Sequence, residues 1–421
     1  MSPTFRALRN PNYRLYLAGS IVSNTGTWMM RVAQDWLVLM PLHGGGQAVG
    51  ITTGLQFLPV LLLTPFAGVV SDRYSKRTLL QFTQAFMGVF SLISAVAAIT
   101  GHSSLALVYV CAFGLGVGAA FDAPARQTFV SEMVDRDDLT NAVGLNSASF
   151  NAARLLGPSL AGLLIAAWGS GQAATGWVFA INAVSYLAVI IQLRRMDQRL
   201  LHTPKPRVLG KGALLDAVRY VGGQPKMVFV LILVFFAGTF GMNFQITSAL
   251  MATEVFGKGA GEYGILGSTL AIGSLAGALM AARRTRIRLR LLAVAAVGFA
   301  VACVIAGSLP TYWLFACFSP VIGFCTLTLL NSANGTMQLE AEPALRGRVM
   351  ALYMTVVQGG TPIGAPIIGW IGAEYGARWT LWLGGALTGL GALLAIVLYA
   401  RARAGSIAGL REVLTPSPAR R

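Results

Sequence analysis

An arginine and an aspartate, Arg31 and Asp35, interrupt a long apolar stretch of the chain, residues 13–40. A charge at the centre of a membrane-spanning helix costs about 2.5–3.5 kcal/mol, so such residues face protein or water and commonly have a function. Their four-residue spacing places both on one face of a helix, where they can neutralise each other. Two interpretations stay open: a structural ion pair that holds the first helix in its bundle, or a pair that titrates or faces a substrate.

Arg154 is another charge within an apolar run, and it also needs a partner or water. It either hydrogen-bonds to carbonyl groups of an adjacent helix or binds an anionic part of a substrate. Further polar, aromatic and methionine side chains in apolar runs are candidates for the lining of a substrate cavity, although many polar residues in membranes only join helices. These candidates are Asn24, Trp28, Asn151, Met242, Gln245, Asn331 and Gln358.

The sequence contains no phosphate loop, nucleophile elbow or cluster of metal-binding residues, so we expect no enzyme, no metal site and no cofactor. The four cysteines all lie in apolar runs, which indicates free thiols packed among helices.

The composition predicts an all-α membrane protein. Hydrophobic residues make up 55% of the 421 residues, charged residues only 11%, and the mean hydropathy is +0.66. Such values exclude a soluble globular protein, and continuous apolar runs of about 20 residues favour helices over a β-barrel. Twelve runs occur in two sets of six: 13–40, 49–70, 78–100, 105–121, 141–167 and 175–193, then 227–252, 263–282, 291–309, 312–337, 349–371 and 379–400.

The basic residues predict the orientation of these spans. If the N-terminus and the connection after every second span lie in the cytoplasm, 28 of the 32 Lys and Arg residues fall on that side. Cytoplasmic loops of multi-pass proteins are typically enriched in Lys and Arg. The asymmetry therefore predicts that both termini are cytoplasmic. The same asymmetry explains the net charge of +17, because basic residues on the cytoplasmic side contact anionic lipid. We therefore expect no nucleic acid partner.

The two sets of spans are related in sequence. Three glycines at the end of the fifth run recur at a constant offset in the eleventh: Gly157, Gly162 and Gly169 match Gly364, Gly369 and Gly376. This duplication predicts two pseudo-symmetric six-helix bundles, residues 1–193 and 227–400, with the substrate site between them near the middle of the membrane. Residues 194–226 are predicted to form a cytoplasmic loop with an amphipathic helix, and 401–421 a basic cytoplasmic tail.

The segment GVVSDRYSKR, residues 68–77, is the most specific motif of the chain. Together with twelve runs in two related sets, it resembles the major facilitator superfamily, whose connection between spans 2 and 3 follows Gly-x-x-x-Asp-Arg-x-Gly-Arg-Lys/Arg. Ser75 stands in place of the second glycine, and Lys76 replaces the arginine that follows it. The resemblance covers essentially the whole chain. It implies a latch that holds the two halves together on the cytoplasmic side.

In such a latch, Gly68 allows helices to approach closely and Asp72 lies against the positive N-terminal end of the eleventh span. Arg73 is expected to pair with Asp122. The simpler alternative is a basic loop that only sets the topology. The residues predicted for the latch are Gly68, Asp72, Arg73, Arg77, Asp122, Arg346 and Arg348.

The fifth run carries a pattern of small residues that includes Gly144, Gly157, Pro158 and Gly162. It resembles the Gly-x8-Gly-x3-Gly-Pro-x2-Gly-Gly motif of drug/proton antiporters, with alanine at two of the glycine positions. Small residues on one face allow tight packing, and a proline bends the helix. Ordinary packing of small residues is the alternative interpretation.

The stretch NTGTWMMRVAQDWLVL, residues 24–39, resembles the first helix of bacterial macrolide and siderophore exporters. The resemblance implies a monomeric transporter of the bacterial cytoplasmic (inner) membrane that exports amphipathic small molecules by alternating access, in exchange for protons. Asp35 is then the expected proton carrier, and Arg31 controls its ionisation. The alternatives are uptake of small molecules or translocation of lysolipids, and a membrane sensor of the same fold that does not transport.

Overall fold

The computed structural model describes residues 3–202, 213–282, 289–342 and 345–402, and every regular element in these ranges is a helix. The first elements in the chain are η1 (Pro3–Arg9), α1 (Pro11–Leu39), α2 (Gly45–Arg73), α3 (Lys76–Ile99), α4 (Leu105–Met133), α5 (Arg136–Ala167), α6 (Gln172–Arg195) and η2 (Gln198–Leu200). The remaining elements are α7 (Ala213–Gly222), α8 (Pro225–Phe236), η3 (Ala237–Gly241), α9 (Phe244–Leu250), η4 (Met251–Val255), α10 (Ala260–Ala282), α11 (Leu289–Ser308), α12 (Tyr312–Glu340), α13 (Arg346–Gly359), α14 (Thr361–Tyr375) and α15 (Ala377–Ala402).

Several long helices begin at a polar residue that caps the first turn. The side chain of Asn10 accepts a hydrogen bond from the backbone of Tyr13 at 3.1 Å, and Pro11 follows at the first helical position. Ser104 and Thr311 cap α4 and α12 in the same way. These side chains satisfy N–H groups that have no partner within the helix. The start of each of these helices is therefore encoded locally.

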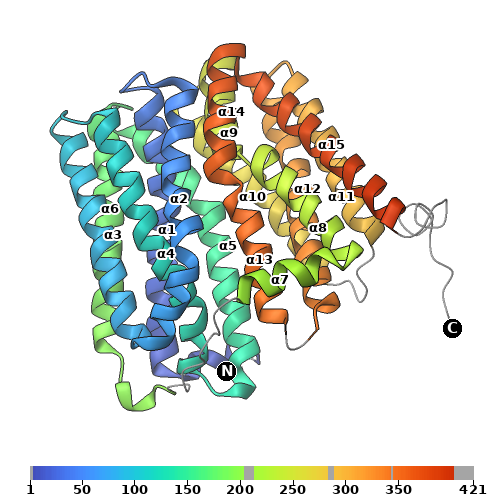
Figure 1. Ribbon diagram of the computed structural model, residues 1–421. Coiled ribbons are helices and arrows are strands. Elements are labelled where there is room, and N and C mark those ends of the chain that lie inside the picture. The colour runs from blue at the N-terminus through green and yellow to red at the C-terminus, as the bar shows by residue number, and fades with distance from the viewer. Residues whose placement is uncertain (1–2, 203–212, 283–288, 343–344, 403–421) are drawn as a thin grey trace. The chain divides into compact units, whose positions relative to one another are not determined.

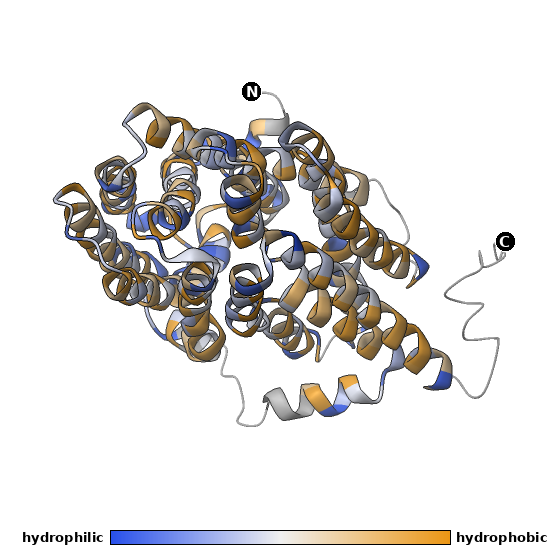
Figure 2. Ribbon diagram, turned by 90° about the horizontal axis from the view of Figure 1, so that it is seen from above, coloured by the Kyte–Doolittle hydropathy of each residue, from blue (hydrophilic) through white to orange (hydrophobic). Residues whose placement is uncertain are grey.

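Ten helical segments of the described residues are long and apolar enough to cross a membrane. Figure 2 shows that the helices are coloured mostly as hydrophobic along their lengths. Helix α1, which carries Arg31 and Asp35, and the pair α13 and α14 are not among the ten. The structure is thus an all-helical, multi-pass membrane protein, as the composition predicted, while the number of twelve spans stays a prediction.

The chain divides into two compact units. Unit 1 comprises Met1–Leu209 and Gly257–Ser268, and unit 2 comprises Gly210–Phe256 and Thr269–Arg421. Helix α10 therefore contributes its first turns to unit 1 and its remaining turns to unit 2. The sequence had suggested that residues 227–400 form one bundle, and the domain boundaries derived from it stay predictions.

Unit 1 is built around helices α1 to α6, which run alongside one another in Figure 1. Helix α1 packs against α5 and α6, α3 packs against α4 and α6, and α2 packs against α4. Near the N-terminus, a buried cluster includes Tyr13, Phe129 and Leu193. The hydroxyl of Tyr13 donates to the carbonyl of Ala142 at 2.7 Å, so the start of α1 is fixed on α5.

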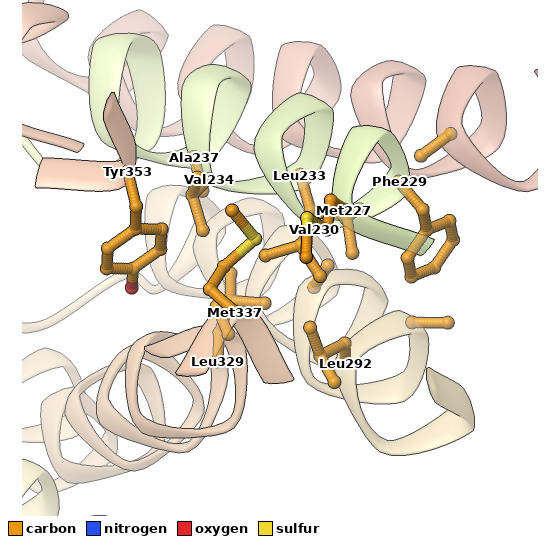
Figure 3. Close-up of a cluster of buried hydrophobic side chains, with 14 of the residues drawn as sticks. Met227, Phe229, Val230, Leu233, Val234, Ala237, Leu292, Leu329, Met337 and Tyr353 are labelled. Atoms are coloured by element: carbon orange, nitrogen blue, oxygen red, sulfur yellow. The ribbon is translucent and has the colours of Figure 1, made fainter. Parts of the chain in front are cut away.

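Unit 2 has its main buried cluster around α8. Met227, Val230 and Leu233 of α8 pack with Leu292 of α11 and Met337 of α12, as Figure 3 shows. Helix α15 also packs on α8 and α11. The apolar side chains of these helices interdigitate. Their van der Waals contacts stabilise the unit.

Two of the predicted spans are interrupted in unit 2. The run 227–252 is split into α8, the π-helix η3, a break at Met242 and Asn243, α9 and the π-helix η4. The run 349–371 is split into α13 and α14 at Gly360. A Cβ atom at Gly238 would lie 3.0 Å from the carbonyl oxygen of Val357, so the interrupted parts pack backbone to backbone. Local π-turns and glycine contacts of this kind are not visible in hydropathy, so the sequence does not predict these interruptions.

The central connection contains helix α7, in the segment where the sequence predicts an amphipathic helix. Ala217 and Val221 are buried, whereas Val218 and Arg219 are exposed. The hydroxyl of Tyr220 accepts a hydrogen bond from the backbone of Glu342 at 3.2 Å. Helix α7 packs against α8 and α13, so its apolar face covers other helices of unit 2.

Candidate functional site

A polar cavity of about 630 Å³ lies inside unit 1, and all six helices α1 to α6 contribute to its walls. Its apolar lining includes Met30, Phe57 and Phe150. Polar side chains are numerous for a cavity within a membrane domain. They are Ser23, Asn24, Thr27, Arg31, Gln56, Gln84, Asp122, Arg126, Gln127, Asn146, Ser147, Asn151 and Tyr186. A pocket with apolar walls and convergent polar groups is the usual form of a small-molecule site, so this cavity is the candidate site.

Arg31 places its guanidinium between this cavity and two aromatic rings. Its Cζ atom lies 4.9 Å from the centre of the Trp28 ring and 5.5 Å from that of Phe57. The Nε atom is buried and has no hydrogen-bond partner. Cation–π contact stabilises the charge but satisfies no N–H donor. Arg31 therefore keeps unused hydrogen-bonding capacity next to the cavity.

Asp35, one turn further along α1, has a different partner. Its side chain is buried, and the hydroxyl of Tyr263 on α10 donates to its Oδ2 atom at 2.7 Å. The ion pairs among the described residues do not include Arg31 with Asp35. The hydrogen-bond partner of Asp35 is therefore Tyr263, and the guanidinium of Arg31 contacts aromatic rings. Tyr263 is not among the residues predicted from the sequence, because it lies 228 residues away from Asp35.

Arg154 of α5 approaches Trp28 as well. Its Cζ atom lies 5.7 Å from the centre of the Trp28 ring, so two guanidinium groups contact one indole. Arg154 and Trp28 themselves do not belong to the lining of the cavity, whereas Asn24 and Asn151 do. Arg154 thus contacts an aromatic ring of α1, and both roles predicted for it stay predictions.

The small residues of α5 create close contacts with two other helices. A Cβ atom at Gly157 would lie 2.6 Å from Cβ of Trp28, so Gly157 lets α5 approach α1 at this ring. Gly162 faces the backbone of α10 at Ala260, and Pro158 packs against Gly267. Gly144 has no neighbour within 4 Å of a Cβ position, so it is not used for close packing here. These contacts position Trp28 and the first turns of α10.

Hydrogen bonds add to the attachment of α10 within unit 1. The hydroxyl of Ser159 on α5 donates to Oγ of Ser268 at 2.7 Å, and Ser268 donates to the carbonyl of Leu155. Together with the bond from Tyr263 to Asp35, these contacts fix one side of α10 on α1 and α5. The helix that carries Tyr263 is therefore held at several points along its first turns.

Asp122 of α4 lies at another wall of the cavity and is fully engaged. Its carboxylate forms an ion pair with Arg126 at 2.7 Å and accepts hydrogen bonds from Thr83 at 2.9 Å and Gln84 at 2.7 Å. The partner predicted from the sequence was Arg73, but the observed partner is Arg126, so this prediction was wrong. Arg126 is one turn away on the same helix, and the spacing of four residues could have identified it.

The basic residues that end the motif 68–77 bind within unit 1. The Nζ atom of Lys76 pairs with the buried carboxylate of Glu132 at 2.5 Å. Arg77 donates to the carbonyl oxygens of Leu193 at 2.6 Å and Arg194 at 2.9 Å, and so caps the end of α6. Cations at the C-terminus of a helix are favourable because the free carbonyl groups there are electron-rich.

The other predicted members of the latch are Gly68, Asp72, Arg73, Arg346 and Arg348. Arg73 is exposed, and Gly68 borders open space. The side chain of Asp72 lies outside the described residues. In unit 2, Arg346 is exposed and Arg348 is partly buried at the start of α13. A latch between the two halves stays a prediction.

The cavity candidates of unit 2 are spread over three interrupted or bent helices. Met242 lies at the break between η3 and α9, and Gln245 lies in the first turn of α9. Asn331 is partly buried in α12, and Gln358 is exposed near the end of α13. Breaks in transporter helices commonly mark binding sites, which keeps Met242 and Gln245 as candidates.

Comparison with known proteins identifies relatives over most of the chain. The multidrug efflux pump Tap of Mycolicibacterium fortuitum is 27% identical, over 84% of this chain and 88% of its own length. The enterobactin exporter EntS of Citrobacter koseri is 22% identical over 86% of each chain. The staphyloferrin A transporter of Staphylococcus aureus is 23% identical over 63% of this chain and 66% of its own length.

The fold has close counterparts among solved structures. A bacterial homolog of the human lysosomal transporter Spinster, in an inward-facing and unoccupied conformation, superimposes with a TM-score of 0.72 at 16% identity, over 97% of this chain and 99% of that one. The family described as transmembrane secretion effector matches residues 2–409. The protein is accordingly a membrane transporter of small molecules and not an enzyme. The chain belongs to the transmembrane secretion effector family of the major facilitator superfamily.

Proposed function

We propose that the protein is a proton-coupled exporter of amphipathic small molecules that works by alternating access. In this proposal twelve spans form two six-helix bundles, both termini are cytoplasmic, and the monomer works in the bacterial inner membrane. The names of its relatives, which include an efflux pump and a siderophore exporter, support export. No cofactor is required, because the proton gradient supplies the energy.

The observation that carries the proposal is the environment of Asp35. A carboxylate that is 4% exposed in α1 receives a hydrogen bond of 2.7 Å from Tyr263 and lies one helical turn from Arg31. Ionisable residues inside a membrane domain are expensive and commonly belong to proton or substrate pathways. Asp35 is therefore the proposed proton carrier, and Arg31 and Tyr263 favour its charged form.

Protonation of Asp35 would weaken its attachment to α10. Hydrogen bonds to an ionised group are roughly twice as strong as those between neutral groups. Loading a proton onto Asp35 would thus convert the bond from Tyr263 into a neutral one and loosen the first turns of α10. Release of the proton would restore the bond. This cycle links proton occupancy to the packing of α10 on α1 and α5.

The test compares driven transport with passive exchange in the same proteoliposomes. Enterobactin, staphyloferrin A and erythromycin are suitable radiolabelled probes, given the names of the relatives and the resemblance to macrolide exporters. Asp35→Asn imitates the protonated form permanently, so it should retain exchange of a transported probe but fail to accumulate it against a gradient. Asp135→Asn is the control, because the Asp135 side chain is 81% exposed.

Proton-driven accumulation by Asp35→Asn at the wild-type rate would exclude Asp35 as the carrier and leave a structural role for it. The direction of wild-type transport decides between export and uptake. Accumulation on the side to which protons flow would identify a symporter instead. A chain that binds a probe but exchanges none of it would indicate a sensor of the same fold.

A further inference from the structure

The cavity of unit 1 is unusually rich in carboxamide groups. Six of its lining residues carry them: Asn24, Gln56, Gln84, Gln127, Asn146 and Asn151. Each carboxamide offers two N–H donors and one acceptor oxygen. Hydroxyl groups of Ser23, Thr27 and Tyr186 add to this lining. Such a wall complements a ligand that has many oxygen atoms, whereas a purely apolar ligand would leave these groups without partners.

The charged side chains that line the cavity differ in how many of their hydrogen-bonding groups have partners. Its ionised lining residues are Arg31, Arg126 and Asp122, which gives one net positive charge. The only carboxylate among them is already bound by Thr83, Gln84 and Arg126. Arg31 instead has a buried Nε atom without a partner. The lining thus combines a carboxylate whose partners all lie in the cavity wall with a guanidinium that has a free Nε donor, while Asp35, one turn from Arg31, is bound by Tyr263.

Two aromatic rings contact the Arg31 guanidinium. Trp28 and Phe57 hold its Cζ atom at 4.9 and 5.5 Å from their ring centres. Trp28 in turn contacts Phe150, whose ring centre is 6.0 Å away and which lines the cavity. Contact with a ring uses none of the N–H donors of a guanidinium, and these donors suit the two oxygens of a planar anion.

We propose that this cavity selects an oxygen-rich organic anion, with a carboxylate or catecholate group bound at Arg31, and disfavours lipophilic cations. This inference rests on the proposed function in so far as the cavity is taken as part of the substrate route. Arg31 recognises the charge, the carboxamides bind the remaining oxygens, and Met30, Phe57 and Phe150 contact the carbon skeleton.

The test is equilibrium binding to the purified full-length protein, without a membrane or a gradient. Citrate and dihydroxybenzoate are the anionic probes, and tetraphenylphosphonium is the cationic probe. We expect saturable binding of at least one anion and weaker binding of the cation. Arg31→Gln should weaken anion binding by about 10- to 150-fold, because it removes a hydrogen-bonding charge from a buried anion. Arg31→Lys should recover part of the loss.

Arg14→Gln is the matched control, since Arg14 is an exposed arginine of the same helix. Its anion affinity should equal that of the wild type. Tighter binding of tetraphenylphosphonium than of both anions would overturn the proposal, and so would the absence of saturable anion binding. Unchanged anion affinity in Arg31→Gln would remove Arg31 from the site. If Arg31→Gln fails to fold, the comparison of probes on the wild-type protein still decides the question of charge.

The outcome is separable from that of the transport test. Anion-selective binding together with gradient-independent transport would refute proton coupling and leave the substrate class intact. Proton-driven transport of a cationic probe, lost in Asp35→Asn, would refute the substrate class and leave the coupling intact.

Discussion

The hydrogen bond between Tyr263 and Asp35 permits a quantitative prediction. The donor and acceptor oxygens are 2.7 Å apart, and Tyr263 and Asp35 are only 3% and 4% exposed. A hydrogen bond to a charged group contributes about 1.5–3 kcal/mol, and removing one partner from a buried pair leaves the other desolvated. Tyr263→Phe should therefore lower the free energy of unfolding by about 1.5–3 kcal/mol while Asp35 is ionised.

The same substitution should cost less when the charge is absent. In an Asp35→Asn background the bond joins two neutral groups, which is worth about 0.5–1.5 kcal/mol. Unfolding of the purified protein in mixed detergent and dodecyl sulfate micelles would measure all four members of this cycle. Tyr375→Phe is the control, because Tyr375 is 62% exposed, and a surface change of this kind alters stability by less than about 0.5 kcal/mol.

Two results would refute this reasoning. One is a stability of Tyr263→Phe that equals that of Tyr375→Phe. The other is an equal cost of Tyr263→Phe in the wild-type and Asp35→Asn backgrounds, which would show that the bond does not respond to the charge. The second result would also remove the proposed link between proton occupancy and the packing of α10.

Two further predictions concern stability. Glu132→Leu should cost about 3–5 kcal/mol, because it leaves Lys76 buried without its partner at 2.5 Å, and the double change Lys76→Met with Glu132→Leu should recover most of it. Equal unfolding midpoints for the single and double variants would contradict this. Gly157→Val should cost about 1–3 kcal/mol and disturb the fluorescence of Trp28, since a Cβ atom would lie 2.6 Å from Cβ of Trp28. Gly144→Val, at an open position, should be tolerated, and equal losses at the two sites would refute the contact.

Much of the architecture follows from the sequence alone. Long apolar runs determine membrane helices because lipid offers no hydrogen bonds to the backbone, so the positions of the helices follow hydropathy. The relative position of residues close in sequence could also be predicted. The period of the α-helix places Arg31 and Asp35 one turn apart on the same face. The spacing of four residues likewise places Asp122 and Arg126 one turn apart on α4. The prediction of Arg73 as the partner of Asp122 did not take this spacing into account.

The partners of these charges were decided by tertiary structure. Tyr263 reaches Asp35 only because α10 packs on α1 and α5, and no periodicity links positions 228 residues apart. Likewise, Arg31 is turned from Asp35 toward Trp28 and Phe57 by rings that three-dimensional packing brings to it. The sequence shows that charged side chains lie in apolar helices. Because burying a charge costs free energy, each of these side chains needs a partner in the folded protein. Which partner it found depended on helices that meet only in the folded chain.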